Sequence, residues 1–241
     1  MFAVGDLVRR QQLEGDEAIE VCVAGLVDHA HAAFAEFLED LEVGERSTDH
    51  DRHVISTPPR GRLSPSALAD RVIEEDPLCQ MWRVRRSNLR AGMGRPDEAI
   101  TDARKAVELD PGFWVGWMDL GILLATRGQH EEVMDSAERA MAAAPWSPYS
   151  LGLMAAALAT GGHAERAEPL LATLRGDSYG GPLGLAVYSL ARGDHEAAAE
   201  WVVKTVDQRF PAAIPRVVRQ FEPLLRSTAA WPRILQAAKL A

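Results

Sequence analysis

The hexapeptide GRPDEA at residues 94–99 decides the fold, because close variants of it recur along the chain. They read GQHEEV at 128–133, GHAERA at 162–167 and GDHEAA at 193–198. The first three copies are 34 residues apart, and the fourth follows after 31. Pro77, Pro111 and Pro145 keep the same 34-residue interval. A fixed period of this length indicates an array of structural repeats.

The sequence pattern of each repeat predicts two antiparallel helices joined by a tight turn. Glycine suits the C-terminal end of the first helix, and an acidic residue suits the first turn of the second. Ala99, Ala103 and Ala106 are spaced i, i+4 and i+7, so they share one face and allow close helix packing. Proline then ends the second helix. Since one hairpin cannot bury its apolar face alone, the sequence predicts an all-α fold of stacked antiparallel helix pairs.

The best-preserved repeat resembles the tetratricopeptide (TPR) family. It reads WMDLGILL at 117–124 and continues with Val133, Ala137, Ala140 and Pro145. Leu124 stands in place of the family's tyrosine, and Ala137 in place of its phenylalanine. The preceding repeat departs from the family pattern at Arg83, Arg86 and Ser87, where Trp, Leu and Gly are expected. The resemblance implies a TPR-like superhelix that binds a protein or peptide partner.

The resemblance extends over residues 61–241. Ser64 and Pro65 predict the start of a helix that ends before Pro77 and reads as the second helix of an earlier repeat. At the other end, FEPLLRS at 221–227, followed by Trp231 and Leu235, resembles a cap on TPR arrays attached to bacterial nucleotide cyclases, kinases and winged-helix regulators. This resemblance implies a role in a bacterial signalling or regulatory assembly.

Residues 1–60 do not match the repeats and form a second predicted unit. Apolar residues at helical spacing over Asp16–Val43 predict one long helix or a kinked pair. The polar stretch Gly44–Arg62 predicts an exposed loop. The helix could pair with the Ser64 helix, lie along the array's inner surface, or mediate self-association.

Composition and charge favour a cytoplasmic protein with no nucleic-acid partner. The formal net charge is −9, and the basic run Arg83, Arg85, Arg86 and Arg90 is short, whereas nucleic-acid binding usually requires a clustered basic face. Neither a signal peptide nor a membrane span is expected. Cys22 and Cys79 are isolated, so no disulfide framework is predicted.

We expect no catalytic residues, metal or cofactor. Cys22, His29, His31, His50 and His53 are the candidate metal ligands, but they lack a known ligand spacing. His130, His163 and His195 occupy equivalent turn positions in different repeats, which places them too far apart to act together. Trp117, Trp201 and Trp231 are predicted to pack, whereas Trp114 and Trp146 are candidate partner contacts. A nucleophile–base pair and a Gly-rich phosphate loop are not visible.

In TPR arrays the first helix of each repeat lines the concave surface. The residues that the resemblance places there, and that we predict to contact a partner, are Met81, Val84, Asn88, Val115, Met118, Ile122, Tyr149, Leu183 and Val187. This set is mostly apolar, unlike the Lys, Arg and Asn set that binds a C-terminal carboxylate. Because an apolar surface is costly to leave in water, three interpretations stay open. A partner segment covers it, the Asp16–Val43 helix covers it, or a tightly wound array closes it into the core.

The sequence therefore predicts an interaction adaptor, with two alternative hypotheses. The chain could be the helical part of a transcriptional regulator, although residues 1–60 show no winged-helix DNA reader. It could also be a metal-dependent enzyme on a TPR-like scaffold that uses the His-rich N-terminal segment. Met118→Glu distinguishes a binding residue from a core residue: the first loses the partner, the second loses the fold.

Overall fold

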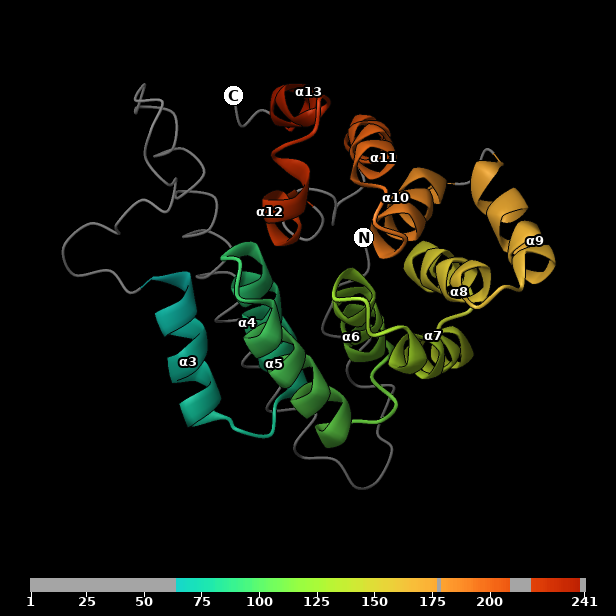
Figure 1. The fold of residues 1–241 in the computed structure, drawn as a ribbon. Helices are drawn as coiled ribbons and strands as arrows, with labels where there is room; N and C mark the ends of the chain where they lie inside the picture. The colour runs from blue at the N-terminus through green and yellow to red at the C-terminus, as the bar shows by residue number, and fades with distance from the viewer. Residues whose placement is uncertain (1–63, 177–178, 209–217, 239–241) are drawn as a thin grey trace, which may run out of the picture. The chain divides into compact units, whose positions relative to one another are not determined.

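The computed structural model describes residues 64–176, 179–208 and 218–238, and all its regular elements in these ranges are helices (Figure 1). The chain divides into two compact units, Met1–Val54 and Ile55–Ala241, and the described residues belong to the second. The prediction of an all-α fold built from stacked antiparallel helix pairs is confirmed. None of the described helices is long and apolar enough to cross a bilayer.

Within the described ranges, one helix precedes four helical hairpins, and two short helices follow them. The first is α3 (Pro65–Glu75). The hairpins are α4 (Gln80–Gly92) with α5 (Pro96–Leu109), α6 (Trp114–Thr126) with α7 (His130–Ala143), α8 (Pro148–Thr160) with α9 (Ala164–Arg175), and α10 (Gly181–Ala191) with α11 (His195–Asp207). The last two are α12 (Glu222–Leu225) and α13 (Trp231–Ala237). The helix predicted from Ser64 to Pro77 is α3.

The four glycine turns predicted from the repeat all adopt the backbone conformation that favours glycine. Gly94, Gly128, Gly162 and Gly193 have φ angles of 72°, 71°, 83° and 76°. A side chain is strained at such angles, whereas glycine is not. The chain therefore reverses between paired helices at each of the sequence positions that share the hexapeptide.

At two helix starts a nearby side chain accepts a hydrogen bond from a backbone N–H of the first turn, and the first of these caps was predicted from the sequence. The backbone N–H of Ala67 donates to Ser64 Oγ at 3.2 Å, which confirms the predicted cap of α3. In the fourth hairpin, the N–H of Ala197 donates to Asp194 Oδ1 at 3.0 Å. The prolines of the repeat follow the ends of α3, α5 and α7, where they prevent further helix.

The hairpins stack through both of their helices. Each first helix contacts its own partner and the first helix of the next hairpin, so that α4, α6, α8 and α10 form one continuous layer. Beyond this, α6 also contacts α10 directly, although α8 lies between them in the repeat order. The backbones of α8 and α10 meet at Gly152 and Gly184, where a Cβ on Gly152 would overlap the Gly184 carbonyl. This close approach lets the apolar side chains of the first helices reach one another.

Candidate functional site: the inner face

The candidate site is the inner face, which we define as the side of α4, α6, α8 and α10 that carries the nine predicted partner-contact residues. Six of these side chains are buried. They are Val84 (1% exposed), Met118 (0%), Ile122 (1%), Tyr149 (6%), Leu183 (0%) and Val187 (0%). The other three, Met81, Asn88 and Val115, are partly exposed. The structure thus brings most of the set into one apolar core, and its contact with a partner remains a prediction.

Part of this burial comes from the array itself. Since α6 contacts α10, Met118 and Leu190 belong to the same buried cluster as Tyr149 of α8. This is the arrangement expected if tight winding closes the inner face. A direct α6–α10 contact removes the space that an open concave surface would leave between these two helices.

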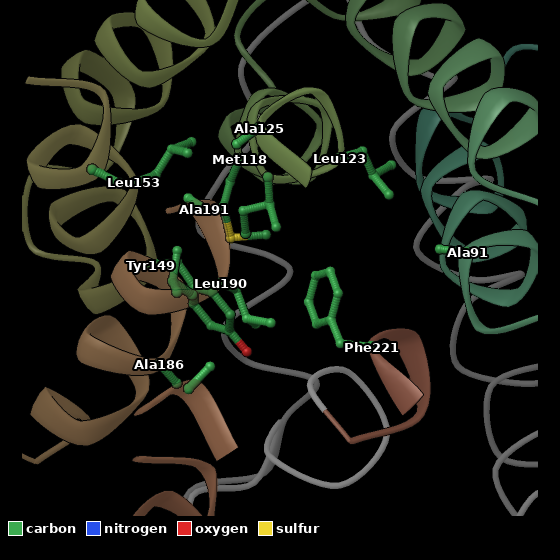
Figure 2. Packing of buried hydrophobic residues seen from close by; sticks show 14 of the residues in the cluster. Ala91, Met118, Leu123, Ala125, Tyr149, Leu153, Ala186, Leu190, Ala191 and Phe221 are labelled. Carbon is green, nitrogen blue, oxygen red and sulfur yellow. The ribbon is translucent and has the colours of Figure 1, made fainter. Parts of the chain in front are cut away.

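The inner face is also buried by the C-terminal segment, which we define as Val218–Leu225. Phe221 is 4% exposed and belongs to the same cluster as Met118 and Leu190. In Figure 2 its ring points into the space between Met118 of α6, Leu190 of α10 and Ala91 of α4. Phe221 therefore covers part of the inner face. Sequence reasoning placed this residue in the cap and did not predict its contact with the first helices.

The cap that follows is attached to the last hairpin. Helices α12 and α13 both contact α11. Arg233 of α13 pairs with Glu200 of α11 at 2.7 Å, and the N–H of Ala229 donates to Glu196 Oε2 at 3.2 Å. Ile234 is fully buried, and Trp231 packs against the core, as its apolar helix face predicted. These contacts hold α12 and α13 against the last hairpin.

A separate, exposed feature lies where α6 and α8 begin. Trp114 and Trp146 form an edge-to-face pair with ring centroids 5.6 Å apart. Trp146 is 71% exposed and Trp114 is partly exposed. Trp117, in contrast, packs against the core, and its Nε1 donates to the Pro111 carbonyl at 2.8 Å. The packing role predicted for Trp117 fits its contacts, while the partner role of Trp114 and Trp146 stays a prediction.

Arg86 and Arg90, two residues of the basic run of α4, form ion pairs within the protein. Arg86 and Arg90 both donate to the carboxylate of Asp102 on α5, which is 2% exposed. Arg86 also pairs with Asp70 of α3 at 2.7 Å. Hydrogen bonding to Asp102 is the main reason that the pKa of Arg86 is raised above its usual value. This network joins α3, α4 and α5, and the role of Arg86 in it is structural.

The other predicted polar candidates do not form a cluster in the described part of the chain. His130 and His195 begin α7 and α11, and His163 lies just before α9. Among the described residues, His, Cys, Asp and Glu side chains form no group of three placed to hold a metal. Cys22, His29, His31, His50 and His53 lie outside the described residues, as does the predicted helix Asp16–Val43. The metal-enzyme alternative therefore remains a hypothesis.

Comparison with known proteins finds matches among solved structures, and in neither of the other two comparisons. No protein-family model matches the chain, and no curated protein matches it. A solved structure to which it is similar is the crystal structure of YrrB, described as a TPR protein with an unusual peptide-binding site. The two chains are 14% identical, the match covers 73% of this chain and 93% of that one, and the TM-score is 0.45.

Proposed function

We propose that this chain is a protein-binding module whose inner face takes a short apolar segment of a partner protein. The observation that carries the proposal is the seating of Phe221. A short stretch from beyond the last hairpin inserts an aromatic side chain among residues of α4, α6 and α10. The inner face thus has the shape and apolar character needed to hold a segment that is not part of the repeats.

Two further features support binding rather than a purely structural role. Aromatic anchors in desolvated pockets contribute disproportionately to protein–protein affinity, and Phe221 is an anchor of this kind. In addition, Asn88 and Val115 remain partly exposed on the inner face and offer a polar and an apolar contact beside the buried set. The resemblance of residues 221–227 to caps of bacterial regulatory proteins favours a partner in a signalling or regulatory assembly.

Site-directed photo-crosslinking tests this function in the cells that produce the protein. The photoreactive residue p-benzoylphenylalanine replaces Asn88 on the inner face, or Arg104 as a matched control. Arg104 is an exposed residue of α5 that pairs with Glu132 of α7 at 2.8 Å, so it lies on the second helices. We expect one specific partner to be captured from position 88 and not from position 104. Capture from position 104 alone, or equal labelling of many proteins from both positions, would contradict the proposal.

A further inference from the structure

The C-terminal segment presents a regular apolar stripe to the inner face. Val218, Phe221 and Leu225 are 2%, 4% and 0% exposed, and they are spaced i, i+3 and i+7. Arg219, between the first two, is exposed. This spacing places three apolar side chains on one side of a helical or near-helical turn. An amphipathic segment that docks into an apolar surface shows the same pattern.

The segment reaches α4 by backbone contact at a glycine. A Cβ on Gly92, the last residue of α4, would lie 2.6 Å from the carbonyl oxygen of Arg219. Real Cβ atoms do not approach a backbone oxygen so closely, so the segment sits where it does because residue 92 has no side chain. Figure 1 shows α12 next to the end of α4 in agreement with this contact. One methyl group at Gly92 is therefore enough to displace the segment locally.

Two buried polar atoms lack hydrogen-bond partners in the C-terminal segment and on α4, which it contacts. The amide nitrogen Nε2 of Gln220 is buried and has no hydrogen-bond partner, although the residue is only 3% exposed. The amide oxygen Oδ1 of Asn88 is also buried without a partner. Asn88 lies one helical turn before Gly92, on the same side of α4. A buried amide without a hydrogen-bond partner disfavours the state that buries it, so Gln220 weakens the docking of its own segment.

We propose that Val218–Leu225 is an internal ligand of the inner face, and that partner segments compete with it for the same seat. This inference rests on the proposed function and names its ligand chemistry and its regulation. The partner segment is helical, with three apolar residues at i, i+3 and i+7, of which the second is aromatic. Binding then requires release of the internal segment, and the intramolecular link gives that segment a high effective concentration.

Hydrogen exchange on the full chain tests whether the segment can be released. The amides of Leu224, Leu225 and Arg226 donate to the Phe221 and Glu222 carbonyls, so their protection reports on the docked segment. In Gly92→Ala we expect these amides to exchange at least 10-fold faster, while those of α6 and α8 keep their protection. Gly176→Ala is the matched control, because a Cβ there makes only ordinary contacts. Unchanged exchange of residues 224–226 in a folded Gly92→Ala chain would overturn the proposal.

Binding in trans tests whether the vacated face accepts a ligand. The probe is a fluorescent synthetic peptide of residues 218–227, together with the same peptide carrying Ala in place of Phe221. A Phe221→Ala chain, which weakens the internal segment but leaves the Gly92 contact surface unchanged, should bind the first peptide at least 10-fold more tightly than the wild-type chain does, and the second peptide weakly. Faster exchange without peptide binding would mean that the segment is a detachable cap and not a ligand, which also overturns the proposal.

Gln220→Met supplies an independent test should Gly92→Ala fold poorly. It removes the unsatisfied amide and keeps a flexible side chain of similar length. We expect slower exchange at residues 224–226 and at least 3-fold less labelling of a partner from position 88. Faster exchange, or unchanged labelling despite slower exchange, contradicts competition for one seat. If position 88 captures a partner equally in Gly92→Ala, Gln220→Met and wild type, the protein-binding function stands and only the internal-ligand inference fails.

Discussion

The guanidinium of Arg86 donates two parallel hydrogen bonds to the carboxylate of Asp102, with Nη2–Oδ1 at 2.6 Å and Nε–Oδ2 at 2.8 Å. Their side chains are 13% and 2% exposed. Removing Asp102 leaves Arg86 with Asp70 as its remaining partner in this network and takes from Arg90 its 2.8 Å ion pair, so two largely buried guanidinium groups lose a counter-charge. We therefore expect Asp102→Ala to lower the free energy of unfolding by about 3 kcal/mol or more.

Urea denaturation followed by circular dichroism checks this value. Asp97→Ala is the matched control, since Asp97 is 77% exposed and its pair with Arg127 is on the surface. That control should lose less than about 1 kcal/mol. Equal midpoints for the two variants would show that the Arg86–Asp102 contact contributes no more than a surface ion pair.

The backbone contact of α8 with α10 predicts a severe effect for one methyl group. In Gly152→Ala the new Cβ would overlap the Gly184 carbonyl, which belongs to a helix and cannot rotate away. Overpacking of this kind costs about 1–3 kcal/mol, and backbone involvement favours the upper end. Thermal unfolding of Gly152→Ala beside Gly176→Ala measures it, and similar melting temperatures would refute the close approach.

Met118 tests the burial of the predicted contact set. It is fully buried, so Met118→Glu places a charge in the core, and we expect loss of the cooperative unfolding transition. Met118→Leu conserves volume and should cost less than about 1.5 kcal/mol. A folded Met118→Glu chain would mean that the inner face opens more readily than the structure indicates. The effect of this substitution on the fold then has to be measured before any loss of partner binding is interpreted.

The exposed tryptophan pair predicts a variant that separates binding from stability. Trp146→Ala removes an edge-to-face contact and little buried surface, so it should cost less than about 1.5 kcal/mol. Trp117→Ala removes a packed ring together with its bond to the Pro111 carbonyl, and should cost about 3 kcal/mol or more. If Trp146 contacts a partner, its replacement also lowers affinity about 10-fold or more while the chain stays folded.

The repeat could be predicted because its signals are local. Gly94, Gly128, Gly162 and Gly193 need a positive φ, and the prolines end helices, so spacing alone locates the hairpins. The start of α3 at Ser64 followed from the same kind of signal. Each of these choices depends on a few neighbouring residues and survives almost any tertiary arrangement.

The covering of the inner face could not be predicted in this way. The contact of Gly92 with Arg219 joins segments on either side of three hairpins. No sequence pattern around either residue indicates that the other is its neighbour. The ion pairs of Arg86 could not be predicted either, because the sequence of a basic run is the same whether its side chains face solvent or a buried carboxylate such as Asp102. The apolar first helices indicated burial by a partner, by the Asp16–Val43 helix or by tight winding of the array, and only the three-dimensional arrangement identified Phe221.

Order of synthesis gives the position of Phe221 a further consequence. The hairpins from α4 to α11 leave the ribosome before the residue that covers them, and translation adds only about 5–20 residues per second. Helical hairpins form in microseconds to milliseconds. On a timescale of about seconds the nascent chain therefore displays a folded but uncovered inner face. On the proposed function, a partner synthesised nearby would meet the inner face before Phe221 emerges to cover it.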